Sequence, residues 1–204
     1  MNTMNEKTSA IRKWLTALAA GAALVALAPA ASATVLTFDD LGADTFMSDL
    51  GNYGGLDWSH SGWFAYNGVD TFLPHSGDFR LASAFGDPGV DSDAQTDIRF
   101  NSAATFQGAW FSGLQGATVT FDLFYQGQKV GTSATLDPSG TPSFLASGYA
   151  GLVDEVMVSS AGPGSYTMDD FTFTQAVPEP ETYALMLAGL VAVGAVARRR
   201  KLRA

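Results

Sequence analysis

Apolar positions divide this chain into three stretches with different patterns. Residues 14–27 form an almost unbroken apolar run, and residues 182–197 contain no charged side chain. Between these runs, apolar residues alternate with polar ones over short distances. Alternation with a period of two residues is typical of β-strands, whereas long apolar runs are typical of segments that enter a membrane. The two ends and the middle are therefore predicted to have different roles.

The first run has the layout of a secretory signal peptide. Lys7, Arg12 and Lys13 precede it, and the small residues Ala31, Ser32 and Ala33 follow it. A basic segment, a short apolar segment and an A-x-A site in this order are what signal peptidase recognises. We expect a signal helix in residues 1–33, with cleavage after Ala33, or alternatively after Ala30.

The middle of the chain predicts one all-β domain at residues 34–176. The clearest strand is 117–125, where Val119, Phe121 and Leu123 alternate with polar residues. A two-residue turn at 127–128 is expected to return the chain through 129–136. Short strands separated by turn signals indicate a single jelly-roll-like β-sandwich. The other expected strands are 35–38, 56–59, 79–82, 97–100, 108–112, 143–146, 153–158 and 166–174.

The second apolar run is preceded by Pro178, Glu179 and Pro180 and followed by the basic residues 198–201. Its 16 uncharged residues span about 24 Å as a helix, slightly less than the roughly 30 Å of a bilayer core. The basic side chains would keep the end of this transmembrane helix in the cytoplasm. Prolines keep the preceding segment extended.

This tail, residues 177–204, resembles the PEP-CTERM sorting signal of Gram-negative bacteria. The resemblance implies that an exosortase in the inner membrane processes the exported protein at Pro178, Glu179 and Pro180. It also implies delivery to the cell surface or to the extracellular polymeric substance, in bacteria that make exopolysaccharide. A plain membrane anchor is the alternative.

Charge is distributed unevenly between the ends and the middle. Residues 34–177 contain 16 Asp and one Glu against Arg80, Arg99 and Lys129, so their formal charge is 3 − 17 = −14. An acidic body disfavours nucleic-acid binding, which needs basic side chains. The chain has no cysteine, which excludes thiol chemistry and cysteine-ligated zinc.

The first and last expected strands of the body carry paired carboxylates, in the segments 36–40 (LTFDD) and 166–173 (YTMDDFTF). This pattern resembles galactose-binding-like jelly rolls, including many carbohydrate-binding modules, in which the first and last strands lie side by side. The resemblance implies a structural Ca²⁺ held by Asp39 and Asp169, with Asp40 and Asp170 as substitutes. Solvated carboxylates at strand ends are the alternative.

Aromatic residues gather around Trp58, Trp63 and Tyr66. Exposed rings beside polar side chains are typical of glycan binding, whereas alternation in a sandwich places rings in the core. Both interpretations remain open, and exposure of the three rings on one face would distinguish them.

No sequence motif for catalysis is present. The chain lacks G-x-S-x-G, H-E-x-x-H, P-loop and G-x-G-x-x-G patterns. The residues therefore give no support to an enzyme. Together with the delivery that the PEP-CTERM resemblance implies, we expect a non-enzymatic surface or matrix protein associated with exopolysaccharide. A carbohydrate-binding module is the alternative.

Overall fold

The computed structural model describes residues 32–42, 46–47, 50–59, 62–68, 71–83, 95–162, 164–176, 185–191, 193–194 and 198. The chain divides into two units, residues 31–176 and the two ends together, which are described separately. The signal segment 1–31 and the sorting residues 178–180 lie outside the described residues.

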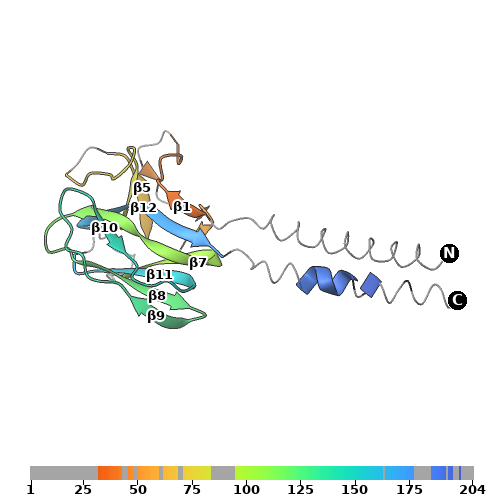
Figure 1. Ribbon diagram of the computed structural model, residues 1–204. Coiled ribbons are helices and arrows are strands. Elements are labelled where there is room, and N and C mark those ends of the chain that lie inside the picture. Colours follow the sequence, from red (N-terminus) through yellow and green to blue (C-terminus); the bar gives the residue numbers. More distant parts are fainter. Residues whose placement is uncertain are drawn as a thin grey trace, which may run out of the picture. The chain divides into compact units, whose positions relative to one another are not determined.

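The first unit is an antiparallel β-sandwich (Figure 1). Its longest path of paired strands runs β2-β5-β6-β12-β7-β11-β8-β9. The strands in the described residues are β1 (Ala33–Leu36), β2 (Phe46–Met47), β3 (Asn52–Tyr53), β4 (Leu56–Asp57), β5 (Trp63–Tyr66), β6 (Arg80–Ser83), β7 (Gln95–Gly113), β8 (Val119–Tyr125), β9 (Gln128–Thr132), β10 (Ser143–Ala146), β11 (Val153–Ser160) and β12 (Tyr166–Gln175).

Strand β7 belongs to both layers of the sandwich. Its first half pairs with β4 and β11, and its second half pairs with β10 and β12. In Figure 1, β8, β9 and β11 lie on one side of the core, and β1, β5 and β12 lie on the other. The expectation of separate strands at 97–100 and 108–112 was wrong, because one strand continues through the polar, solvent-exposed residues Asn101 and Ser102.

The first and last strands are neighbours, as the jelly-roll resemblance implied. β1 pairs antiparallel with β12 from Ala33 opposite Thr174 to Leu36 opposite Phe171. Strand β12 thus has β1 or β6 on one side and β7 on the other. This arrangement makes β12 the central strand of its layer.

The strand predicted at 117–125 is confirmed by β8, whose side chains alternate between buried and half-buried positions. The turn that follows is formed by Gln126 and Gly127, one residue earlier than expected, because β9 already begins at Gln128. Both turn residues have a positive φ, 53° and 72°, as a two-residue hairpin turn requires.

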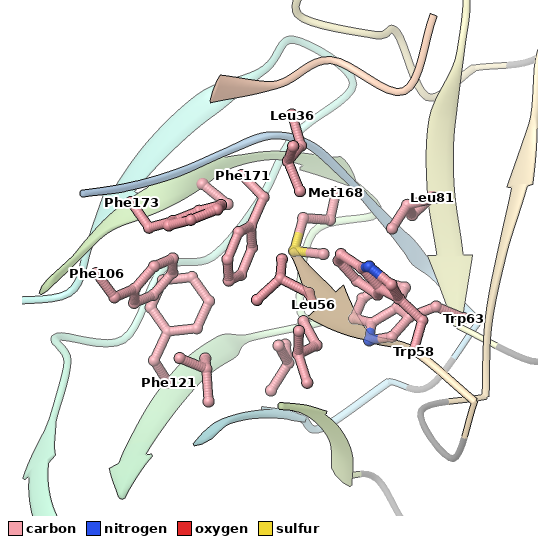
Figure 2. Packing of buried hydrophobic residues seen from close by; sticks show 14 of the residues in the cluster. Leu36, Leu56, Trp58, Trp63, Leu81, Phe106, Phe121, Met168, Phe171 and Phe173 are labelled. Carbon is pink, nitrogen blue, oxygen red and sulfur yellow. The ribbon is translucent and has the colours of Figure 1, made fainter. Parts of the chain in front are cut away.

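Aromatic rings from both layers fill the core (Figure 2). Phe171 stacks on Phe106 with centroids 4.5 Å apart, and Phe106 meets Phe121 of the opposite layer edge-on at 4.9 Å. Trp58 contacts Phe171 at 5.9 Å. Such offset and edge-on pairs add stability beyond the burial of their area. Phe171 therefore lies at the centre of the packing.

In the second unit, residues 185–191 are helical, and most of their apolar side chains are exposed. No helix within the described residues has both the length and the apolar character needed to cross a bilayer.

We predict that Phe171→Ala lowers the free energy of unfolding by about 3–5 kcal/mol, because it opens a cavity among the stacked rings. Phe144→Ala, which removes a ring that is 42% exposed, is the matched control and should cost less than about 1 kcal/mol. Urea unfolding measures both. Equal losses for the two variants would contradict the assignment of Phe171 to the centre of the core.

Candidate functional site

Two adjacent carboxylates lie where β12 departs from regular pairing. Asp169 is opposite Trp110 of β7, and the register between the two strands shifts before Thr172. Asp170 takes up the shift with a φ of 47°, a backbone conformation that aspartate tolerates better than most residues. Both side chains belong to buried residues, with only 3% and 6% of the surface exposed. The irregularity thus places two acids side by side under the neighbouring loop.

Asp169 accepts hydrogen bonds from backbone amides. Its Oδ2 atom accepts the N–H of His75 at 2.8 Å and of Ser76 at 2.9 Å, and its Oδ1 atom accepts the N–H of Asp170 at 2.7 Å. Burial raises the pKa of Asp169, the neighbouring charge of Asp170 also raises it, and the three N–H donors lower it; the net pKa is about 7. The carboxylate is therefore poised to change charge near neutral pH.

Asp170 binds the side chains of the same two loop residues. Its Oδ2 atom lies 2.5 Å from Nδ1 of His75, and its Oδ1 atom accepts the hydroxyl of Ser76 at 2.7 Å. The imidazole of His75 stacks on the ring of Trp110, with centroids 3.5 Å apart and planes 11° from parallel. Trp110 in turn contacts Phe144 of β10 at 5.6 Å. A carboxylate, an imidazole and two aromatic rings thus form one continuous cluster.

The first strand contributes a third carboxylate to the same loop. Asp39, three residues after β1, accepts the N–H of Asp78 at 2.8 Å and of Phe79 at 3.0 Å. A Cβ at Gly77 would lie 2.0 Å from Oδ1 of Asp39, and Gly77 also has a positive φ of 46°. Only glycine fits this approach. Asp39, Asp169 and Asp170 together hold residues 75–79 against β12 and the segment that follows β1.

A structural Ca²⁺ at Asp39 and Asp169 was expected from the sequence, and this site stays a prediction. The two carboxylates come from segments beside the first and last strands, and both accept backbone N–H donors of residues 75–79. Among the described residues, no group of three or more His, Cys, Asp or Glu side chains is arranged to hold a metal ion. The contacts that the structure shows for these carboxylates order the loop at 75–79.

The three aromatic residues proposed for glycan contact differ in their exposure to solvent. Trp58 and Trp63 are each only 2% exposed and pack in the core, so they offer no face to a sugar and the glycan interpretation is wrong for them. Tyr66 is half-buried, and the guanidinium carbon of Arg80 lies 4.3 Å from its ring centroid. Trp63 is buried and Tyr66 is not because side chains alternate between the two faces of β5.

The structure describes only some of the residues at the expected signal-cleavage site and sorting motif. Ala33 opens β1 and is exposed, whereas Ala31, Pro178, Glu179 and Pro180 lie outside the described residues.

Sequence reasoning missed the cluster around His75. Strict alternation along residues 106–111 predicts Trp110 in the core with Phe106, and the residues around His75 form no motif that marks this histidine as more than a loop residue. The residue that could have indicated this arrangement is Gly108, because a second register shift lies next to it, between the inward-facing Phe106 and Phe111. This shift turns Trp110 to the outer face, which strict alternation from Phe106 does not reveal.

Comparison with known proteins identifies the tail. Residues 176–201 match the PEP-CTERM protein-sorting motif. The chain carries a PEP-CTERM sorting signal. The resemblance seen in the sequence is thereby confirmed, and the signal begins directly after β12 ends at Gln175. No curated protein matches the chain.

The solved structures similar to this chain include family 29 carbohydrate-binding modules. A structure of such a module has 15% identity and a TM-score of 0.38, and the match covers 72% of this chain and 90% of that one. Mutants of CBM29-2 complexed with mannohexaose and with cellulohexaose give the same identity and TM-score, with 72% of this chain covered and 93% and 98% of theirs.

The raised pKa of Asp169 predicts how stability depends on pH. Because the folded-state pKa of about 7 exceeds the ordinary value of 3.8, the contribution of Asp169 is fully present below about pH 4 and is lost as pH rises to about 7. Relative to Asp169→Asn, the wild type should therefore lose a few kcal/mol of unfolding free energy across this range. Urea titrations at several pH values measure the difference.

His75→Gln is the control for this experiment, since His75 is the other titratable group that faces the two carboxylates. The His75→Gln variant should keep most of the pH dependence of the unfolding free energy. A constant difference between wild type and Asp169→Asn from about pH 4 to about pH 8 would contradict the assignment to Asp169.

Proposed function

We propose that this protein is exported and is then processed by an exosortase at Pro178, Glu179 and Pro180. The observation that carries the proposal is the match of residues 176–201 to the sorting motif. Strand β12 ends at Gln175, and the last backbone bond of the sandwich runs from Ala176 N–H to the carbonyl of Ala103. The motif therefore follows the folded body in sequence, and its cleavage would sever no strand of the sandwich.

The proposal includes a membrane-anchored stage before processing. Residues 182–197 carry no charge, and residues 198–201 are all basic. The helical residues 185–191 expose Leu185, Met186, Leu190 and Val191 to between 59% and 74%. Lipid would cover these side chains at a gain of roughly 25 cal/mol per Å² of apolar surface. Their chemistry supports a transient anchor in the inner membrane, with the basic end in the cytoplasm.

At the other end, we propose removal of residues 1–33 by signal peptidase. The basic and apolar segments and the A-x-A site support this step. Cleavage after Ala33 removes the first residue of β1, which pairs with Thr174, and leaves the pairs from Thr34 to Leu36 in place.

The mature body is proposed to act by binding rather than by catalysis, at the cell surface or in the extracellular matrix of a Gram-negative bacterium. Its buried carboxylates, Asp169 and Asp170, are hydrogen-bonded to the loop at 75–79, so these acids are used for structure. Association with exopolysaccharide is the binding role that suits a sorted matrix protein. The outward-facing Trp110 and the exposed Phe144 favour a carbohydrate-binding role for the body.

We predict that the mature chain begins at Thr34. N-terminal sequencing of the exported protein checks this position. A chain that retains Met1 after export would contradict the signal-peptide assignment, and a start at Ala31 would indicate the alternative site.

We also predict that replacing Pro178, Glu179 and Pro180 by alanine leaves the protein in the inner membrane. The apolar segment and the basic tail would still insert, but the exosortase would lack its motif. Fractionation of the native host, with antibody detection in the inner-membrane and surface fractions, measures the distribution.

Pro142→Ala is the matched control, because it removes a proline from the body and leaves the tail intact. It should reach the surface as the wild type does. Equal surface delivery of the triple-alanine variant and the wild type would refute processing at this motif.

A further inference from the structure

We propose that the outer face of β1, β12, β7 and β10 binds a neutral glycan, with Phe144 as the stacking ring. This inference makes the proposed association with exopolysaccharide more specific. It rests on that proposed function only for the biological role of the binding. Four strands lie side by side here, and strand pairing sets their outward rows: Val35 lies opposite Thr172, Thr172 opposite Gly108, and Gly108 opposite Ala146.

Phe144 is held in position from two sides. It is 42% exposed on β10 and contacts Trp110 at 5.6 Å, and Trp110 is covered by the stacked ring of His75. A Cβ at Gly108 would lie 2.7 Å from the tip of the Phe144 ring and 2.2 Å from the carbonyl oxygen of Leu145. The ring therefore extends across a strand position without a side chain. A ring that is fixed before binding loses little side-chain entropy when a ligand stacks on it.

Hydroxyl and amide groups continue the face beyond this ring. Thr105, Thr172 and Thr174 are half-buried on β7 and β12, and Nε2 of Gln107 donates to the hydroxyl of Thr174 at 2.9 Å. Within the described part of the chain, the buried Oε1 of Gln107 has no hydrogen-bond donor. A sugar presents CH groups on its faces and hydroxyls at its edges, so it matches a ring flanked by such groups.

The charges on this face favour a neutral ligand. The segments β1, β10, β12 and 104–113 contain no Lys or Arg, and the buried pair Asp169 and Asp170 lies directly beside Trp110. Arg80, on the same layer, is buried, and its guanidinium donates to the carbonyls of Gly68 and Asp78. An anionic polysaccharide would meet repulsion without a cationic partner.

The combination of apolar and hydroxyl side chains on this face favours a glycan over an apolar partner. Val35 and Phe144 are the large apolar side chains exposed on these four strands, and hydroxyl-bearing residues separate them. A protein interface core or a lipid surface would need a more continuous apolar patch.

The test is affinity electrophoresis of the full-length chain through gels that contain dextran, mixed-linkage β-glucan, mannan or the anionic polysaccharide alginate. We expect at least one neutral polysaccharide to retard the protein and alginate to leave its mobility unchanged. Phe144→Ala should weaken binding about tenfold or more, whereas Phe144→Tyr should retain it, because a ring remains. Thr174→Val should weaken binding several-fold.

Leu114→Ala is the matched control, since Leu114 is 54% exposed outside the four strands and should not affect binding. Urea midpoints confirm that each variant is folded. Absence of binding to every neutral polysaccharide, binding to alginate alone, or equal binding by wild type and a folded Phe144→Ala would each overturn the proposal. Sorting is measured separately in cells, so an absence of glycan binding would not contradict the proposed processing at residues 178–180.

Discussion

The pairing of β12 with β7 is the constraint on which the rest of this structure depends. It joins residues from Tyr166 opposite Gly113 to Gln175 opposite Ala104, and it supplies both Phe171 for the core and Asp169 for the outer surface. The register shift after Asp169 lets one strand serve both purposes. Without the extra residue, strict alternation would not place two consecutive acids where both can bind the loop at 75–79.

That loop shows how an acidic body uses its charge. Three of its carboxylates, the exposed Asp39 and the buried Asp169 and Asp170, accept donors from residues 75–79. The cost is the desolvation that raises the pKa of Asp169. The gain is an ordered segment beside the outer face of the sheet, with His75 laid flat on Trp110.

Much of the fold follows from sequence patterns because those patterns are local. Alternation identified β8, β10, β11 and β12 closely, and the resemblance to galactose-binding-like jelly rolls implied that the first and last strands are neighbours. The tail was identifiable because its motif, apolar segment and basic end follow one another directly.

The parts that sequence reasoning missed depend on contacts between distant residues. The amide donors of Asp169 come from a loop more than 90 residues away, and His75 gives no sign in its own neighbourhood that it will meet Asp170. Likewise, Trp58 and Trp63 could be assigned to the core only once β4 was paired with β7 and β5 with β6.

The position of β12 also has a mechanical meaning. A body attached to a surface through its C-terminal end would receive any pulling force at Gln175, the last residue of a strand that is hydrogen-bonded on both sides along much of its length. Force directed along such a strand loads several ladder bonds at the same time, because these bonds run perpendicular to the strand. Flow or drag on the surrounding matrix would therefore be borne by a strand that is paired on both sides.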